Sequence, residues 1–112
     1  MIYLASPYSH NNPSVMQARF KMAEKYTALL LQQGRIIFSP IVHCHELART
    51  YELPTDFSFW QNYCLGMLAK ADELWVLQLD GWKHSTGVAA EIEFADENEM
   101  PILLRDFPSE LL

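Results

Sequence analysis

The sequence predicts an α/β domain in three layers, with a small parallel sheet of four to five strands between two layers of helices. Short, almost wholly apolar runs alternate along the chain with longer segments of helical periodicity. Strands that are apolar on both sides are typical of parallel sheets whose two faces are covered by helices. At 112 residues, 50% of them hydrophobic and 20% charged, the chain is expected to form a single domain over residues 1–112.

The first third of the chain predicts a strand, a long helix and a second strand. Residues 2–5 (IYLA) are apolar and stop at a Ser-Pro pair, as in a buried strand that ends in a loop. Asn12 and Pro13 are typical of a helix N-cap and of a first helical position, and this helix is expected to end at Gly34. Residues 35–38 (RIIF) predict the second strand, which is expected to end at the pair Ser39-Pro40.

The middle of the chain is ambiguous. Residues 41–56 are compatible with a short helix near residues 45–50. A further helix is expected to begin at a cap formed by Asp56 or Ser58 and to end near Ala69.

The last third contains the strongest strand signal. Residues 73–79 (ELWVLQL) are apolar almost throughout, and Gly81 ends the run. A helix over residues 87–98 and a final strand over residues 101–104 (PILL) complete the alternation. This order of elements predicts a flavodoxin-like or Rossmann-like sheet.

A candidate site follows from the loops at one edge of the sheet. Parallel sheets bind ligands beyond the carboxyl ends of their strands. That rule selects three loops, at residues 6–12, 39–45 and 80–87. In the third loop, Ser85 precedes a helix whose first backbone N–H groups lack partners, so an anion can bind there. Glu91 lies four residues after Gly87, on the same helical face, and is expected to point into the space that the glycine leaves free. The same pattern is also ordinary for a capped helix start.

Three blocks carry a family resemblance: YLASPYS at residues 3–9, LAKADELWVL at 68–77 and STGVAAEIEFA at 85–95. In order and spacing they resemble the nucleoside 2-deoxyribosyltransferase superfamily. The nearest branch is the 2'-deoxynucleoside 5'-monophosphate N-glycosidases, whose motif likewise reads S-x-G-V-x-x-E. The chain also looks like a related bacterial and phage group.

The resemblance implies an enzyme that hydrolyses the N-glycosidic bond of a nucleoside or (deoxy)nucleoside 5'-monophosphate. It implies Glu91 as the nucleophile of a glycosyl-enzyme intermediate and Asp72 as the group that assists departure of the base. Such a pair works when one carboxyl is ionised and the other is protonated, which requires environments that separate their pKa values. We expect Glu91 to stay ionised near the helix N-terminus, and burial beside Leu74 and Trp75 to raise the pKa of Asp72.

The resemblance also implies the substrate contacts, which are Ser6, Tyr8 and Ser9 in the first loop and Ser85 and Gly87 around a 5'-phosphate. The first loop of the hydrolases is glycine-rich and contains an arginine, where this chain has SPYSHNN, so Arg19 or His10 would have to replace that arginine. Trp82 lies in a glycine-containing loop and is expected to stack on the base. His43 or His45 is expected at the rim of the base pocket.

Several function classes are disfavoured. A net charge of −6 with only eight Lys and Arg residues argues against a nucleic-acid polymer as partner. The run His43-Cys44-His45-Glu46 fits no standard metal site, because in an extended segment Cys44 would point away from both histidines, so no metal or cofactor is expected. Two cysteines without C-x-x-C spacing, and a start that resembles neither a signal peptide nor a membrane span, predict a cytoplasmic protein.

Two alternatives stay open at this stage. The first is transfer of the sugar between bases, which uses the same nucleophile but excludes water. The second is a nucleotide-binding or sensing module without turnover. The resemblance further implies a homodimer or larger homo-oligomer, because members of the superfamily complete each pocket with a neighbouring subunit.

Overall fold

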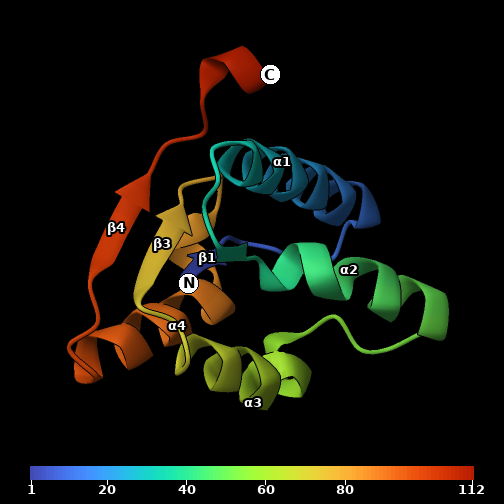
Figure 1. Ribbon diagram of the computed structural model, residues 1–112. Coiled ribbons are helices and arrows are strands. Elements are labelled where there is room, and N and C mark those ends of the chain that lie inside the picture. The colour runs from blue at the N-terminus through green and yellow to red at the C-terminus, as the bar shows by residue number, and fades with distance from the viewer.

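The computed structural model describes residues 1–112 and contains a four-stranded sheet in which every strand pair is parallel. The strand order is β2-β1-β3-β4, and the strands are β1 (Ile2–Ala5), β2 (Ile37–Phe38), β3 (Glu73–Leu77) and β4 (Ile102–Arg105). Four α-helices surround the sheet, and they are α1 (Pro13–Gln32), α2 (Pro40–Tyr51), α3 (Phe57–Leu68) and α4 (Thr86–Glu97). The predicted three-layer α/β fold is confirmed, and its arrangement is that of a flavodoxin-like or Rossmann-like domain (Figure 1).

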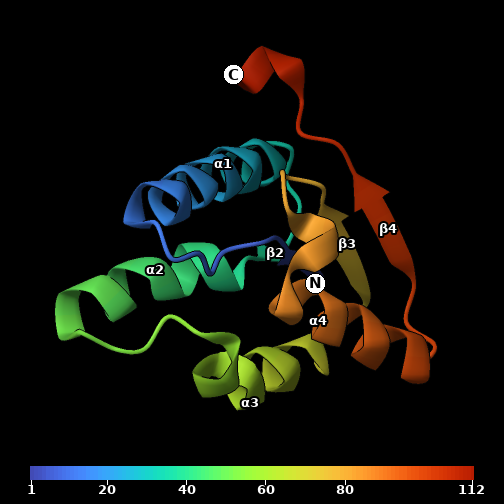
Figure 2. The same cartoon turned by 180° about the vertical axis from the view of Figure 1, so that it is seen from behind.

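The central strand β1 separates two hydrophobic cores. Tyr3 and Ala5 lie in the core beneath α3 and α4, whereas Ile2 and Leu4 lie in the core beneath α1. Figures 1 and 2 show α1 on one side of the sheet and α3 and α4 on the other. Because successive side chains of a strand point to opposite faces, a strand covered on both faces has to be apolar at every position.

Two helices begin with the same device. Asn12 and Ser39 are N-caps whose side chains accept a hydrogen bond from a backbone N–H of the first turn, and a proline follows each of them. The expected short helix at residues 45–50 is in fact the twelve-residue α2, and the predicted strand at residues 35–38 is reduced to the two residues of β2. The Ser-Pro pair at position 39 was interpreted as the end of a strand, although it also begins a helix as the Asn-Pro pair does.

The remaining elements match their predicted positions within two residues. Asp56 precedes α3 as predicted, and Gly81 ends the β3 segment with a positive φ of 89°. A 3-10 turn, Trp82–His84, then leads into α4. None of the helices combines the length and the apolar character needed to cross a bilayer.

Candidate active site

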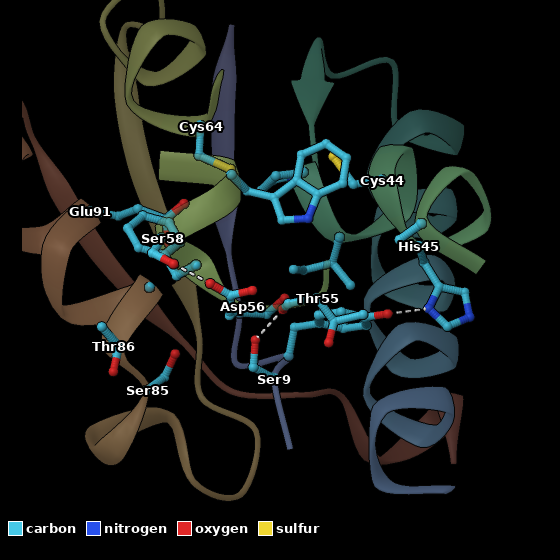
Figure 3. A pocket seen from close by; sticks show the side chains of 18 of the residues that line it. Ser9, Cys44, His45, Thr55, Asp56, Ser58, Cys64, Ser85, Thr86 and Glu91 are labelled. Atoms are coloured by element: carbon cyan, nitrogen blue, oxygen red, sulfur yellow. Dashed lines mark hydrogen bonds between the residues drawn. The ribbon is translucent and has the colours of Figure 1, made fainter. Parts of the chain in front are cut away.

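A pocket of about 390 Å³ opens beyond the carboxyl ends of β1 and β3 (Figure 3). All three loops selected from the sequence contribute to its wall. A fourth segment, residues 55–58 at the start of α3, also lines it and was not predicted. The pocket therefore lies where ligands of parallel sheets bind.

Glu91 is buried in this pocket. Its residue is only 4% exposed, and its carboxylate accepts a hydrogen bond from the hydroxyl of Tyr3 on β1. Burial raises the pKa of Glu91 to about 8, although the hydrogen bond from Tyr3 acts in the opposite direction. The expectation of an ionised Glu91 at neutral pH is therefore wrong, because the influence of the helix N-terminus fades after the first turn and Glu91 lies in the second.

Gly87 lines the pocket for a different reason from the one predicted. A Cβ atom at this position would lie 2.9 Å from Cδ1 of Phe57, so the glycine allows α3 to approach the start of α4. The space beside Gly87 is filled by the Phe57 ring and is not left free for Glu91. Glu91 reaches the pocket because its helical face is turned toward β1, where Tyr3 holds it.

A second carboxylate in the pocket is Asp56. It is exposed, and its side chain accepts a hydrogen bond from the Ser58 hydroxyl instead of capping α3. That hydrogen bond lowers the pKa of Asp56. Figure 3 shows Asp56, just before α3, and Glu91, on α4, facing the same hollow. From the sequence, Asp56 had only the role of a possible cap, and its position ahead of a helix start was the one available signal.

Asp72 is not in this pocket. It directly precedes β3 and therefore lies at the amino end of that strand, whereas the pocket lies at the carboxyl end. Its carboxylate pairs with the N-terminal amine of Met1, and its side chain is 80% exposed. The prediction that Asp72 is buried is therefore wrong. The prediction that it pairs with Glu91 is also wrong, because the two residues of one chain do not share a pocket.

His45 lines the pocket, and His43 does not. Both lie on α2, so two residues of separation turn their side chains roughly 200° apart. His43 is exposed and stacks on Tyr63, with ring centroids 5.6 Å apart. Cys44 also lies on α2, so the prediction that placed it in an extended segment is wrong. Its side chain lines the pocket as well.

Trp82 is likewise absent from the pocket wall. It is half-buried and packs against the core beneath α4, so the predicted stacking on a base does not fit its position. The 3-10 turn that carries it presents His84 to the pocket instead.

Five predicted contact residues do line the pocket, and they are Ser6, Tyr8, Ser9, Ser85 and Gly87. The Ser6 hydroxyl is buried without a hydrogen-bond partner. Ser9 donates to the backbone oxygen of Thr55, which ties the first loop to the segment before α3. The Ser85 side chain caps α4 by accepting from the backbone N–H of Val88.

The hydroxyl of Tyr8 belongs to a short polar chain in the pocket wall. It lies 2.7 Å from Nδ1 of His45, and Nε2 of His45 lies 2.9 Å from the side-chain oxygen of Gln17. The imidazole stacks on Phe20 with a centroid separation of 4.1 Å. Burial lowers the pKa of His45, so its ring is neutral at neutral pH.

The pocket has no permanently cationic side chain. No Lys or Arg lines it. Nη1 of Arg19 donates to the backbone oxygens of Tyr8 and Ser9, at 3.3 and 3.1 Å, and Nη2 donates to that of Asp80 at 3.1 Å. Arg19 is thus engaged in joining the first and third loops. His10 is exposed outside the pocket, where its Nδ1 accepts a hydrogen bond from a backbone N–H. Neither residue is placed to bind a phosphate in the pocket.

The two cysteines are free thiols that both line the pocket. Burial raises the pKa of Cys44 to about 11 and that of Cys64 to about 12. Because the thiolate is the nucleophile and the metal ligand, neither side chain is activated at neutral pH. The side chains of His, Cys, Asp and Glu form no group of three that could hold a metal ion.

Comparison with protein families gives one match that covers most of the chain. Residues 1–106 match the family described as Domain of unknown function (DUF1937). None of the curated proteins matches the chain. The matched range includes all four strands and every residue of the pocket. The chain therefore belongs to the DUF1937 family.

Proposed function

We propose that the pocket cleaves the N-glycosidic bond of a nucleoside, with Glu91 as the nucleophile. The observation that carries the proposal is a buried carboxyl group facing a pocket, where its only side-chain partner is Tyr3. Burying a carboxyl group lowers the stability of a protein. Strongly perturbed pKa values of groups in a cleft are typical of catalytic residues. The resemblance of the STGVAAE segment to a family with a catalytic glutamate at this position supports the same assignment.

The first chemical step forms a glycosyl-enzyme intermediate. An ionised oxygen of Glu91 attacks the anomeric carbon, and the C1'–N bond breaks with its electron pair going to the base nitrogen. The departing base requires a proton. His84 lies exposed at the rim of the same pocket, and imidazole is the commonest general acid in enzymes, so we assign this role to His84.

The second step releases the sugar. A water oxygen attacks the anomeric carbon, the ester bond to Glu91 breaks, and its electron pair returns to the carboxylate. The water must lose a proton. Asp56 is the other carboxylate in the pocket, and we assign it the role of accepting that proton because it is ionised and faces the same hollow. Asp56 thus takes the place of Asp72 as the second carboxylate of the scheme.

The charges of the pocket favour nucleosides over nucleoside monophosphates. Two carboxyl groups line it, no Lys or Arg does, and Arg19 is held by three backbone oxygens elsewhere. A phosphate group would have only the N-terminus of α4 to bind to, and the ionised carboxylate of Asp56 would repel it.

The test is a screen of ribo- and deoxynucleosides and their 5'-monophosphates for release of free base, measured by chromatography. We expect release from nucleosides by the wild-type protein and loss of that activity in Glu91→Gln. Glu93→Gln is the matched control, because Glu93 lies on the same helix but is exposed and does not line the pocket. Full activity of Glu91→Gln would overturn the assignment.

The same screen separates the rival functions when a second free base is added. Exchange of one base for the other, without free sugar, identifies a transferase. Recovery of intact nucleoside from a protein that binds it identifies a binding module, in which case Glu91→Gln leaves the affinity unchanged.

A further inference from the structure

The wall of the pocket opposite Glu91 contains a group of residues that the proposed reaction does not use. Tyr8, His45 and Gln17 form a hydrogen-bonded chain, with donor–acceptor separations of 2.7 and 2.9 Å. Figure 3 shows His45 on the far side of the hollow from Glu91, with the dashed line marking its bond. His45 is 5% exposed, and the ring of Phe20 stacks against it. The imidazole at the centre of this hydrogen-bonded chain is therefore a fixed part of the pocket wall.

The direction of these hydrogen bonds follows from the chemistry of their members. The side-chain oxygen of Gln17 can only accept, so Nε2 of His45 must carry the hydrogen. In the neutral ring, Nδ1 then has a free lone pair and accepts from the Tyr8 hydroxyl. The single hydrogen of that hydroxyl is thereby used. Tyr8 consequently presents only lone pairs to the pocket.

This side of the pocket suits a nucleobase better than a sugar. Ile41 and Ala48 lie four residues before and three residues after His45, so all three share one face of α2. The indole of Trp60 lines the pocket as well. Flat apolar surfaces of this kind bind aromatic rings. The side that carries Glu91 is formed by small polar residues such as Ser85 and Thr86, which suit the sugar hydroxyls.

We infer that Tyr8 selects nucleobases that present an exocyclic amine, as adenine and cytosine do, over their deaminated counterparts hypoxanthine and uracil. The inference rests on the proposed function for the identity of the ligand as a nucleoside. An exocyclic amine donates to the Tyr8 oxygen. A carbonyl oxygen at the same place directs lone pairs against lone pairs and leaves both groups without a partner. A single mismatched polar contact of this kind discriminates by about ten- to a hundredfold.

The experiment compares matched pairs of ligands in two formats. The first is kcat/KM for deoxyadenosine against deoxyinosine, and for deoxycytidine against deoxyuridine. The second is calorimetric binding of free adenine against free hypoxanthine, which requires no turnover. For the wild-type protein we expect the amino form to be preferred by about tenfold or more in both formats.

Two variants test whether Tyr8 is the cause. Tyr8→Phe removes the oxygen, and we expect the preference to fall to about threefold or less. Gln17→Met removes the acceptor that holds the hydrogen on Nε2, so the hydrogen can move to Nδ1 and turn the Tyr8 hydroxyl toward the ligand as a donor. We expect this variant to shift the preference toward hypoxanthine. Gln17 is exposed, so the change is compatible with folding, and Gln32→Met at the other end of α1 is the matched control.

The outcomes separate this inference from the proposed function. Equal use of both members of each pair, with ratios unchanged in Tyr8→Phe and Gln17→Met, overturns the inference and leaves N-glycosidic cleavage standing. A Tyr8-dependent preference for adenine in the binding format, without cleavage of any nucleoside, supports the inference and overturns the catalytic proposal. Failure to bind either free base, together with equal cleavage of both nucleosides, also overturns the inference.

Discussion

Replacing Tyr3 with phenylalanine removes the one hydrogen bond that the Glu91 side chain receives. That bond stabilises the ionised carboxylate, whereas burial destabilises it. If Glu91 attacks the sugar, only its ionised form reacts. We therefore expect Tyr3→Phe to lower kcat/KM at neutral pH.

The size of the effect follows from the pKa of Glu91. With a pKa of about 8, roughly one molecule in ten carries the ionised form at neutral pH. A hydrogen bond to a charged group contributes about 1.5–3 kcal/mol, which corresponds to about a ten- to hundredfold smaller ionised fraction when it is lost. The pKa of Glu91 rises further in the variant, so its activity recovers only at a higher pH.

The measurement is kcat/KM for a cleaved nucleoside between about pH 6 and pH 10, for the wild type and the variant. Both proteins need a protonated His84, so the ratio of the two kcat/KM values isolates the effect on Glu91. We expect the ratio of Tyr3→Phe to wild type to be lowest near about pH 6 and to rise above about pH 8. Tyr26→Phe is the matched control, because Tyr26 is a buried tyrosine in the core beneath α1, and its curve should coincide with that of the wild type. A ratio of Tyr3→Phe to wild-type kcat/KM that stays constant between about pH 6 and pH 10 would refute the reasoning, since it would mean that the Tyr3 hydrogen bond does not act through the ionisation of Glu91.

Three further predictions concern stability and the second carboxylate. The pKa of Glu91 rises from 4.5 to about 8 on folding. Between these two pH values the folded protein keeps a proton on Glu91 that the unfolded protein loses, so the free energy of unfolding decreases as the pH rises from 4.5 to about 8. Urea unfolding at pH 5 and pH 8 should show this loss, of a few kcal/mol, in the wild type but not in Glu91→Gln. Gly87→Ala forces a Cβ against Phe57 and should lower the free energy of unfolding by about 1 kcal/mol or more, whereas Gly66→Ala, with nothing within 4 Å, should raise it by about 0.5–1 kcal/mol. Asp56→Asn should lower kcat by about a hundredfold without moving the limb of the pH profile that belongs to Glu91, and an unchanged kcat would contradict its role as the base.

The fold could be predicted because its signals are local. The runs IYLA and LWVL are apolar at every position, and this property alone indicates strands covered on both faces. The rule that ligands bind at the carboxyl ends of the strands then selected loops that do line the pocket. The helix α2 was predicted too short because the Ser-Pro pair at position 39 both ends one element and begins the next.

The sequence could predict which residues line the pocket only where their place relative to the strand ends decides it. Tyr8 and Ser85 lie in loops that come after strand ends, and both line the pocket. His43 and His45 stayed alternatives because the sequence did not show that the segment is helical, and on a helix only one of the two, His45, faces the pocket. Asp72 was chosen from the resemblance although it precedes its strand, which places it at the wrong edge of the sheet.

The protonation state of Glu91 is the clearest case of a property that spacing could not supply. Its place in the second turn of α4 follows from the sequence, but its burial depends on how closely α3 and β1 approach it. That approach is set by residues far away in the chain: Phe57 packs against Gly87, and Tyr3 donates to the carboxylate. An apolar side chain at position 91 would pack in the same core without the cost of burying a carboxyl group. The carboxyl group at position 91 therefore lowers the stability of the fold, and this cost is the physical reason to expect a role for it in chemistry.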